Sequence, residues 1–234
     1  MNRLSRSPAA RTLAVAAAAL ALTPTLAAAE GQARRPSPNS DTAHGPQKLV
    51  DKAVSVVDEM KRDPHLRALL GRAAGVYVVP EYGRAGFIIG GRGGTGVVVA
   101  HQARGWTAPA FYSFGGLSIG LQAGGAGGSI AFILMNRKAV QEFVAHNKVS
   151  FNANAGLAIV KYSAGDQADV DRGDVVLWTN TKGAYAGATI EANDIARDGG
   201  RTRDFYGREV PTSAILNGQV TAPGARFLQN ALAR

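Results

Sequence analysis

Few residue patterns in this chain could support nucleotide or hydrolase chemistry. Residues Gly91–Gly96 satisfy G-x-G-x-x-G, a loop whose glycines let a backbone approach a pyrophosphate. A dinucleotide site also needs a helix directly after that loop, whereas three β-branched residues, Val97–Val99, follow here. We therefore interpret the segment as a glycine-rich turn between strands. The chain has no G-x-x-x-x-G-K-[ST] phosphate loop and no G-x-S-x-G elbow, so an unrecognised hydrolase is an alternative without sequence support.

Metal-binding patterns are also weak. The four histidines are scattered and form no H-E-x-x-H motif or pair at metal-ligand spacing. The acidic loop Asp166–Asp174 could hold a hard cation such as calcium, but its spacing differs from that of a calcium loop and Arg172 lies inside it. The absence of cysteine excludes disulfides, thiolate catalysis and cysteine-ligated zinc. We expect a chain with no metal, no cofactor and no enzymatic activity, and a solvated turn at the acidic loop.

Basic side chains are the strongest candidates for a binding site. Residues Gln47–Asp63 carry apolar residues at helical spacing, which predicts an amphipathic helix, while Lys48, Lys52, Lys61 and Arg62 occupy its other faces. Such a helix can lie on a bilayer, with cations on lipid phosphates. Mixed charge is also typical of a helix that faces a protein core. The segment that contains this helix has six basic and four acidic residues, and so a net charge of +2. The basic residues are Lys48, Lys52, Lys61, Arg62, Arg67 and Arg72, and the acidic ones are Asp51, Asp58, Glu59 and Asp63.

The charge balance and the first residues favour an exported protein. The 234 residues include 26 Lys+Arg and 17 Asp+Glu, a formal charge of +9. Residues 1–29 read as a signal peptide, because three arginines precede the apolar stretch Leu13–Leu22 and Ala27–Ala29 form a small-residue cleavage site. Removing those three arginines lowers the charge from +9 to +6. We expect a protein of the periplasm, or of the periplasmic face of the envelope, that is attracted to anionic surfaces.

Beyond the signal peptide, residues 30–46 are predicted to be a disordered linker, and residues 47–234 a single domain. Helices are expected at Gln47–Asp63, around Leu66–Leu70, after the capping residue Asn136, and after Pro223. Short apolar runs punctuated by glycine predict strands at 76–79, 86–89, 96–100, 111–114, 117–123, 129–135, 157–162, 175–179 and 184–190. The fold class is therefore α+β, with a glycine-rich antiparallel core, barrel- or sandwich-like, an N-terminal amphipathic helix, a middle helix and a C-terminal helix.

The uncharged stretch Gly105–Asn136 has two interpretations. Gly116, Gly120, Gly124 and Gly128 stand four apart, so on a helix they form a ridge of the kind that lets transmembrane helices approach closely. Read with a period of two, the apolar residues of 117–123 alternate with small and polar ones, as in a strand. In water each glycine would disfavour a helix by about 1 kcal/mol relative to alanine. We favour strands, and keep a membrane-inserted glycine-ridge oligomer as an alternative.

Seven phrases, in order, resemble the SYLF-domain family, a lipid-binding module found in bacterial exported proteins and in eukaryotic membrane-trafficking and actin-associated proteins. The resemblance extends from about Gln47 to Gly207. The matching phrases are Val79-Pro80 with Arg84–Phe87, then Gly90–Gly96, Gly105–Phe111, Gly120–Gly124, Met135-Asn136, Lys182–Gly187 and Phe205–Gly207. Arg84 stands where the family commonly has lysine, which keeps the charge.

The resemblance implies binding of acidic lipids and, in some eukaryotic members, of actin. Actin is not available to an exported bacterial-type protein, so anionic phospholipid at a membrane surface is the expected partner, and no nucleic acid is expected. The proposed lipid-binding residues are Lys48, Lys52, Lys61, Arg62 and Arg84. A periplasmic scaffold of the envelope that binds protein partners is the alternative outside lipid binding.

Overall fold

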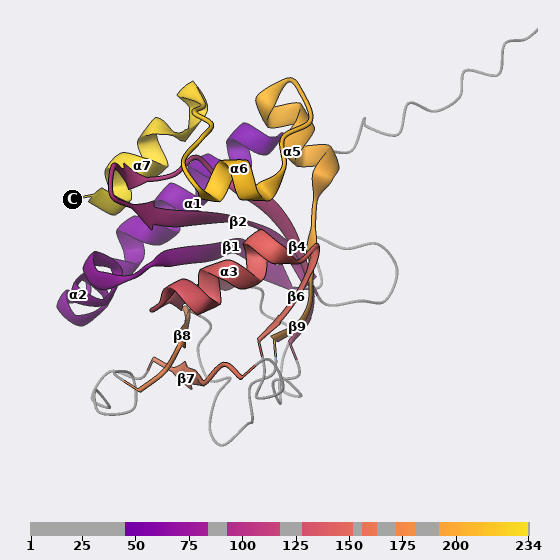
Figure 1. Cartoon of the computed structure of the whole chain (residues 1–234). Coiled ribbons are helices and arrows are strands. Elements are labelled where there is room, and N and C mark those ends of the chain that lie inside the picture. Colours follow the sequence, from indigo (N-terminus) through magenta and orange to yellow (C-terminus); the bar gives the residue numbers. More distant parts are fainter. Residues whose placement is uncertain are drawn as a thin grey trace, which may run out of the picture. The chain divides into compact units, whose positions relative to one another are not determined.

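The computed structural model describes residues 45–83, 93–117, 128–151, 156–162, 172–180 and 192–233, which form a curled sheet with helices on both faces (Figure 1). The helices are α1 (Pro46–Met60), α2 (Pro64–Arg72), α3 (Arg137–Ala145), α5 (Gly199–Tyr206), α6 (Thr212–Leu216) and α7 (Arg226–Ala233), with the 3-10 turn η2 (Pro223–Ala225) before α7. The strands are β1 (Gly75–Gly83), β2 (Gly93–Gln102), β3 (Gly105–Trp106), β4 (Ala110–Leu117), β5 (Gly128–Leu134), β6 (Lys148–Phe151), β7 (Ile159–Lys161), β8 (Val175–Thr179) and β9 (Ala192–Arg197).

The sheet confirms the predicted α+β class with a mainly antiparallel core. Its strand order is β6-β9-β4-β2-β1-β5-β8-β7, and β3 pairs with β2 at its end. Every described pair is antiparallel except β7 with β8, which is parallel and was not expected. Some neighbouring strands are far apart in the chain, as are β4 and β9, which pair in an antiparallel arrangement.

The predicted helices are present at α1, α2, α3 and α7. Asn136 caps α3 as expected, since its side-chain oxygen accepts a hydrogen bond of 3.0 Å from the backbone N–H of Ala139. Pro223 opens the turn that leads into α7. The acidic residue Asp63 caps α2 in the same way, so that Pro64 is the first residue of that helix.

Five elements were missed: β3, β6, β9, α5 and α6. In β9 only Ile195 among the side chains described is fully buried, and Asp194 has a positive φ of 65°, so the strand has no regular alternation. Helix α5 begins with Gly199 and Gly200, the poorest formers after proline, and buries only Thr202. Its start is fixed instead by Asp198, whose carboxylate accepts from the backbone N–H of Arg201 at 2.9 Å.

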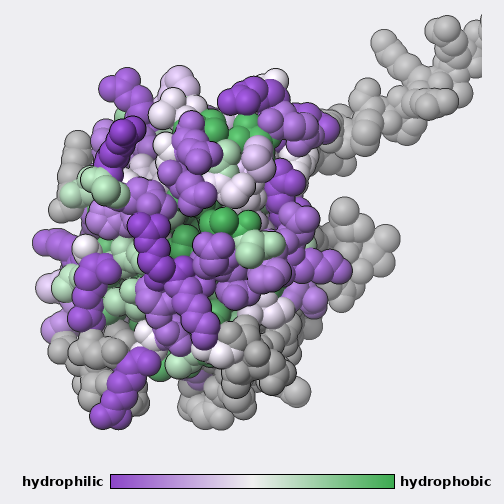
Figure 2. Space-filling view, viewed as in Figure 1, coloured by the Kyte–Doolittle hydropathy of each residue, from purple (hydrophilic) through white to green (hydrophobic). Residues whose placement is uncertain are grey.

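The core has two layers, one on each side of the sheet. On one side α1, α2 and α7 cover alternate residues of the central strands, among them Val76, Val78, Val97 and Val99. On the other side α3 and α6 pack against a cluster rich in aromatic residues, to which α3 contributes Phe143. The other aromatic residues named here come from the strands, and they are Tyr77, Tyr112, Phe114, Phe132 and Phe151. The surface on the α3 side is mostly hydrophilic, with hydrophobic residues visible near the centre of the view (Figure 2).

Close approach of neighbouring strands requires glycine at two positions of β2. A Cβ atom on Gly96 would lie 2.3 Å from the carbonyl oxygen of Val78, and one on Gly94 would lie 2.5 Å from that of Glu81. Here β1 carries an irregularity between Val78 and Glu81, where its register against β2 shifts. The G-x-G-x-x-G segment thus enters β2 rather than a helix, which confirms that it is no dinucleotide loop.

The strand interpretation of the uncharged stretch is confirmed at both its ends. Gly116 lies in β4 opposite Asn193, and Gly128 lies in β5 opposite Tyr82. Gly120 and Gly124 lie outside the described residues, as do the predicted strands at 86–89 and 184–190. Within the described ranges, no helix is both long and apolar enough to cross a bilayer. A helical ridge through Gly116 and Gly128 is therefore incompatible with their strand pairing.

Candidate site: a basic corner between α1 and α2

The apolar face of α1 belongs to the protein core. Val50, Ala53, Val57 and Met60 have no exposed surface and pack with the sheet and α7. Of the two interpretations of this amphipathic helix, the structure therefore favours a helix whose apolar face packs on the protein core. Any contact of α1 with a membrane must use its opposite, polar face.

The predicted lipid-binding residues on α1 fall into two groups. Lys48 and Lys52 lie one turn apart near the start of the helix, and Lys61 and Arg62 lie just after its end. A helix rises 1.5 Å per residue, so about 14 to 21 Å along the helix axis separates the residues of the two groups. Arg84, the fifth predicted residue, lies outside the described residues. The structure therefore does not bring Lys48, Lys52, Lys61 and Arg62 together as one site.

The first group is partly neutralised within the protein. The ammonium of Lys52 lies 2.7 Å from a carboxylate oxygen of Glu81 on β1, in an ion pair whose two side chains are 26% and 61% exposed. Pairs this exposed contribute little to stability, about 0–1 kcal/mol. Glu81 nevertheless lowers the charge that Lys52 presents to an outside anion.

The second group lies where the C-termini of α1 and α7 each accept hydrogen bonds from a basic side chain. The ammonium of Lys61 donates a hydrogen bond to the carbonyl of Ala231, in the last turn of α7. The guanidinium of Arg67 donates from Nε (3.2 Å) and Nη2 (2.8 Å) to the carbonyl of Lys61, the residue that ends α1. Carbonyls at helix C-termini lack helical partners and carry partial negative charge, so both cations are well placed there.

Asp63 and Tyr162 hold this corner against the sheet. The hydroxyl of Tyr162, just after β7, donates a hydrogen bond of 2.6 Å to the carboxylate of Asp63, which also accepts from the N–H of His65 at 2.8 Å. The bond from Tyr162 is the main reason that the pKa of Asp63 is lowered. Burial, together with the bond to Asp63, raises the pKa of Tyr162 to about 12. The orientation of α2 thus depends on a carboxylate that stays ionised at neutral pH.

Arg67 and Arg72 also border this corner, and our sequence analysis left them out of the site. Both are exposed on α2, a nine-residue helix that contains no acidic residue. The side chain of Arg62 is likewise exposed and makes no hydrogen bond or ion pair with any residue the structure describes. The absence of acids from residues 64–72 was visible in the sequence, and it is the signal that could have identified Arg67 and Arg72. We call Lys61, Arg62, Arg67 and Arg72 the basic corner.

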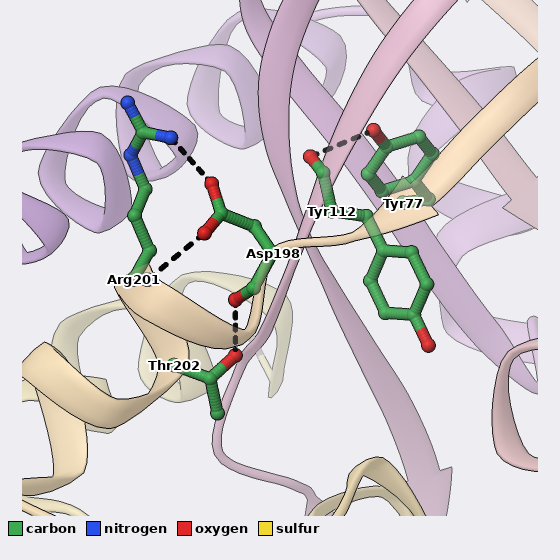
Figure 3. A network of polar contacts seen from close by, with 5 residues as sticks. All are labelled: Tyr77, Tyr112, Asp198, Arg201 and Thr202. Carbon is green, nitrogen blue, oxygen red and sulfur yellow. Dashed lines mark hydrogen bonds and ion pairs between the residues drawn. The ribbon is translucent and has the colours of Figure 1, made fainter. Parts of the chain in front are cut away.

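A second concentration of polar side chains is buried near the start of α5 and has a structural explanation (Figure 3). The hydroxyl of Tyr77 donates to the backbone carbonyl of Tyr112 at 3.1 Å, and that of Tyr112 donates to the carbonyl of Phe143 at 2.9 Å. Asp198 caps α5 and pairs with Arg201. Burial raises the pKa of both tyrosines, which keeps their hydroxyls protonated. These groups link sheet and helices rather than forming a nucleophile with its base.

The predicted cation loop is only partly described. Asp174 uses one carboxylate oxygen to accept from the side chain of Asn136 and the other to accept from the N–H of Ala158 at 2.7 Å. The rest of the acidic cluster, Asp166 to Asp171, lies outside the described residues. Among the residues that are described, no group of three or more His, Asp or Glu side chains could hold a metal. Asp174, just before β8, therefore links the residue that caps α3 to the residue that precedes β7.

These features define a small α+β module that presents charged side chains on a helical surface and uses its buried polar groups for structure. A family profile described as "Ysc84: Las17-binding protein actin regulator" matches residues 115–234, just over half of the chain. The chain therefore belongs to the Ysc84 family, the SYLF-domain proteins that its motifs resemble.

Curated relatives support this assignment. The protein YSC84 of Saccharomyces cerevisiae is 30% identical over 163 residues, which cover 67% of this chain and 35% of the relative. An SH3 domain-containing protein of Schizosaccharomyces pombe is 29% identical over 166 residues, or 68% of this chain and 38% of the relative. An SH3 domain-containing YSC84-like protein 1 of Xenopus laevis is 27% identical over 165 residues, covering 68% and 48%. The chain thus matches between about a third and a half of the length of these relatives.

Proposed function

We propose that this chain is an exported, non-enzymatic module that binds anionic phospholipid at a membrane surface through basic side chains. The observation that carries the proposal is the basic corner, where four cations surround the junction of α1 and α2 and two of them are fixed at helix C-termini. A Lys or Arg near an anionic bilayer contributes about 1 kcal/mol, so three or four are enough for reversible attachment. The family membership is compatible with a binding module.

Export and a periplasmic location are part of the same proposal. They rest on the signal-like residues 1–29. In a membrane of anionic lipid, electrostatic attachment of this kind weakens as salt screens the charges over about 8–10 Å. The attachment is therefore peripheral and reversible.

The direct test is sedimentation of the purified chain with lipid vesicles. The protein, prepared without detergent, is mixed with neutral vesicles or with vesicles containing anionic phospholipid, at low and at high salt. Binding to anionic vesicles that salt reverses is the expected result. Equal binding to neutral vesicles, or none to either kind, would reject the proposal.

A protein partner is the second candidate function, and the names of the relatives favour it. LAS seventeen-binding protein 3, from two strains of Saccharomyces cerevisiae, is 29% identical to this chain, and its name describes a protein-binding role for that relative. On this alternative the chain is a scaffold of the envelope. It predicts recovery of specific proteins with the tagged chain from detergent-cleared extract, together with no affinity for pure lipid.

A further inference from the structure

The exposed face of α2 differs from that of α1, the helix before it. Leu66, Leu69 and Leu70 are buried against the core. The exposed residues carry no negative charge, and they are Pro64, His65, Arg67, Ala68, Gly71 and Arg72. On α1, by contrast, the exposed residues include Asp51 and Asp58 beside Lys48. An anionic surface that approaches α2 therefore meets no repelling group on that helix.

Helical geometry places the arginines of α2 on either side of a strip of small residues. At 100° per residue, Ala68 and Gly71 lie near the middle of the exposed face, with Arg72 on one flank and Arg67 on the other. Neither small residue extends far from the backbone. A flat anionic surface can therefore approach α2 closely, and the two guanidiniums can reach it from either side. Arg62, one turn before, adds a third guanidinium at the same end of the molecule.

The acidic residues around this face are few. From Lys61 to Arg72 the chain has four cations and one acid, Asp63, so the segment carries a charge of +3 with histidine neutral. The carboxylate of Asp63 is bound by Tyr162 on the sheet side and by the N–H of His65. On α1 the nearest acids are Glu59 and Asp58, three and four residues before Arg62, and the carboxylate of Glu59 accepts a hydrogen bond from the side chain of Asn180 at 3.2 Å. The local charge is thus clearly positive.

The cations of this face are mostly arginines, and this determines the chemistry they can recognise. A guanidinium offers five N–H donors in a planar fork that fits two oxygens of one phosphate, which an ammonium cannot do. Arg67 uses only Nε–H and one side of Nη2 on the carbonyl of Lys61, so donors remain for a ligand. Arginines on a protruding helix suit phosphates that are presented in a plane, as in a bilayer surface.

We infer that α2 is the helix that lies against the membrane, with Arg62, Arg67 and Arg72 bound to lipid phosphates and the apolar face of α1 held in the core. This inference rests on the proposed lipid binding and assigns it to a surface and to three residues. It places α2, at the left margin of Figure 1, toward the bilayer. Lys52 and Lys48 then lie about 15 and 21 Å from Arg62 along α1 and contribute less.

The test compares two variants that each remove three exposed cations. R62Q/R67Q/R72Q removes the arginines of the α2 corner. R137Q/K148Q/R208Q removes exposed cations from α3, β6 and the loop after α5, so both variants have the same net charge. With vesicles containing phosphatidylglycerol at low salt, we expect at least about a tenfold loss of partitioning for the first variant and less than about twofold for the second. Equal losses in the two variants would overturn the inference, because binding would then follow net charge alone.

Two further measurements separate folding and phosphate recognition from charge. R62Q/R72Q leaves the bond from Arg67 to Lys61 intact, and it should still lose most of the binding while its thermal unfolding matches that of the original chain. R62K/R67K/R72K keeps the charge but removes the guanidinium fork, and we expect an affinity between those of the original chain and the glutamine variant. Full binding by R62Q/R72Q would contradict the assignment of the contact to α2. Full binding by R62K/R67K/R72K would contradict the inference that the guanidiniums bind the phosphates.

Failure of this inference is distinguishable from failure of the proposed function. If the unaltered chain does not bind anionic vesicles, the proposed function itself is wrong. If the unaltered chain binds and R62Q/R67Q/R72Q binds equally well, the function stands and the surface is wrong. In that second case K48Q/K52Q identifies whether the start of α1 is the contact instead.

Discussion

The phenol of Tyr162 and the carboxylate of Asp63 are 2.6 Å apart across 99 residues of sequence, and this hydrogen bond joins the edge of the sheet to the start of α2. Asp63 is at once the cap of α2 and the acceptor for Tyr162. The start of α2 is therefore tied to the sheet through a carboxylate that must remain ionised. Loss of its charge weakens both contacts together.

We expect Tyr162→Phe to destabilise the fold by about 1 kcal/mol, since it removes a hydrogen bond to a half-exposed charged group. The pKa of Asp63 is lowered in the fold, so this stabilisation is fully present above its ordinary value of 3.8 and is lost as the pH falls through the lowered value. The pKa of Tyr162 is raised to about 12, so the bond also disappears as the pH rises from 10 through that value. Chemical denaturation from pH 2.5 to 8 measures the difference between the two chains. A difference that does not shrink at acid pH would show that the bond does not depend on ionised Asp63.

Glu81 is expected to restrain lipid binding through Lys52. Replacing Glu81 with Gln removes a negative charge and releases the ammonium of Lys52 from its 2.7 Å ion pair. Because Lys52 lies farther from the bilayer than α2, the added attraction is smaller than the roughly 1 kcal/mol of a cation at the surface, and it predicts tighter binding to anionic vesicles by less than about fivefold. Stability should change by less than about 1 kcal/mol, because the pair is exposed. The double variant E81Q/K52Q serves as the control and should lose most of the gain; a gain that persists there would mean that Glu81 acts through general repulsion and not through Lys52.

Local signals in the sequence predicted the elements that local chemistry determines. Asn136 before a periodic segment identified the start of α3, and the spacing of Val50, Ala53 and Val57 identified α1. Periodicity shows that a helix has an apolar face, but it does not show whether protein or lipid covers that face. The covering residues come from β1, β2 and α7, which are distant in the chain, and so only the folded structure could assign the face to the core.

Elements formed by distant partners were not predictable in the same way. β9 pairs with β4 and β6, and its residues include a positive φ at Asp194 and few apolar side chains. The basic corner has the same origin, because Lys61 acquires its partner from Ala231, 170 residues later. The sequence analysis chose cations by their place on one helix, whereas the fold groups them by the helix ends that meet. Arg67 and Arg72 were omitted for that reason.

Close strand approach makes Gly96 the most sensitive of the core glycines. The Cβ of Gly96→Ala would lie 2.3 Å from the carbonyl oxygen of Val78 on the neighbouring strand, which neither backbone can relieve without breaking the pairing. We expect a loss of at least about 3 kcal/mol, or failure to fold. Gly71→Ala is the matched control, since nothing lies within 4 Å of its added Cβ and the residue is inside α2. It should stabilise the protein by up to about 1 kcal/mol. Comparable thermal unfolding of the two variants would refute this explanation of the glycine-rich strands.

A substitution at Met60 tests whether the apolar face of α1 is covered by the protein core or by lipid. Its side chain has no exposed surface and lies in the cluster that α1 forms with α2, α7 and the sheet. Met60→Ala should therefore cost about 2–5 kcal/mol of stability, because it leaves a cavity. At temperatures where the variant is still folded, its binding to anionic vesicles should be unchanged. Ser55→Ala, on the exposed side of α1, should affect neither quantity. If α1 instead inserted its apolar face into lipid, Met60→Ala would weaken vesicle binding and leave thermal unfolding nearly the same. Circular dichroism melting and vesicle sedimentation on the two variants decide between these arrangements, because each arrangement predicts a loss in only one of the two measurements.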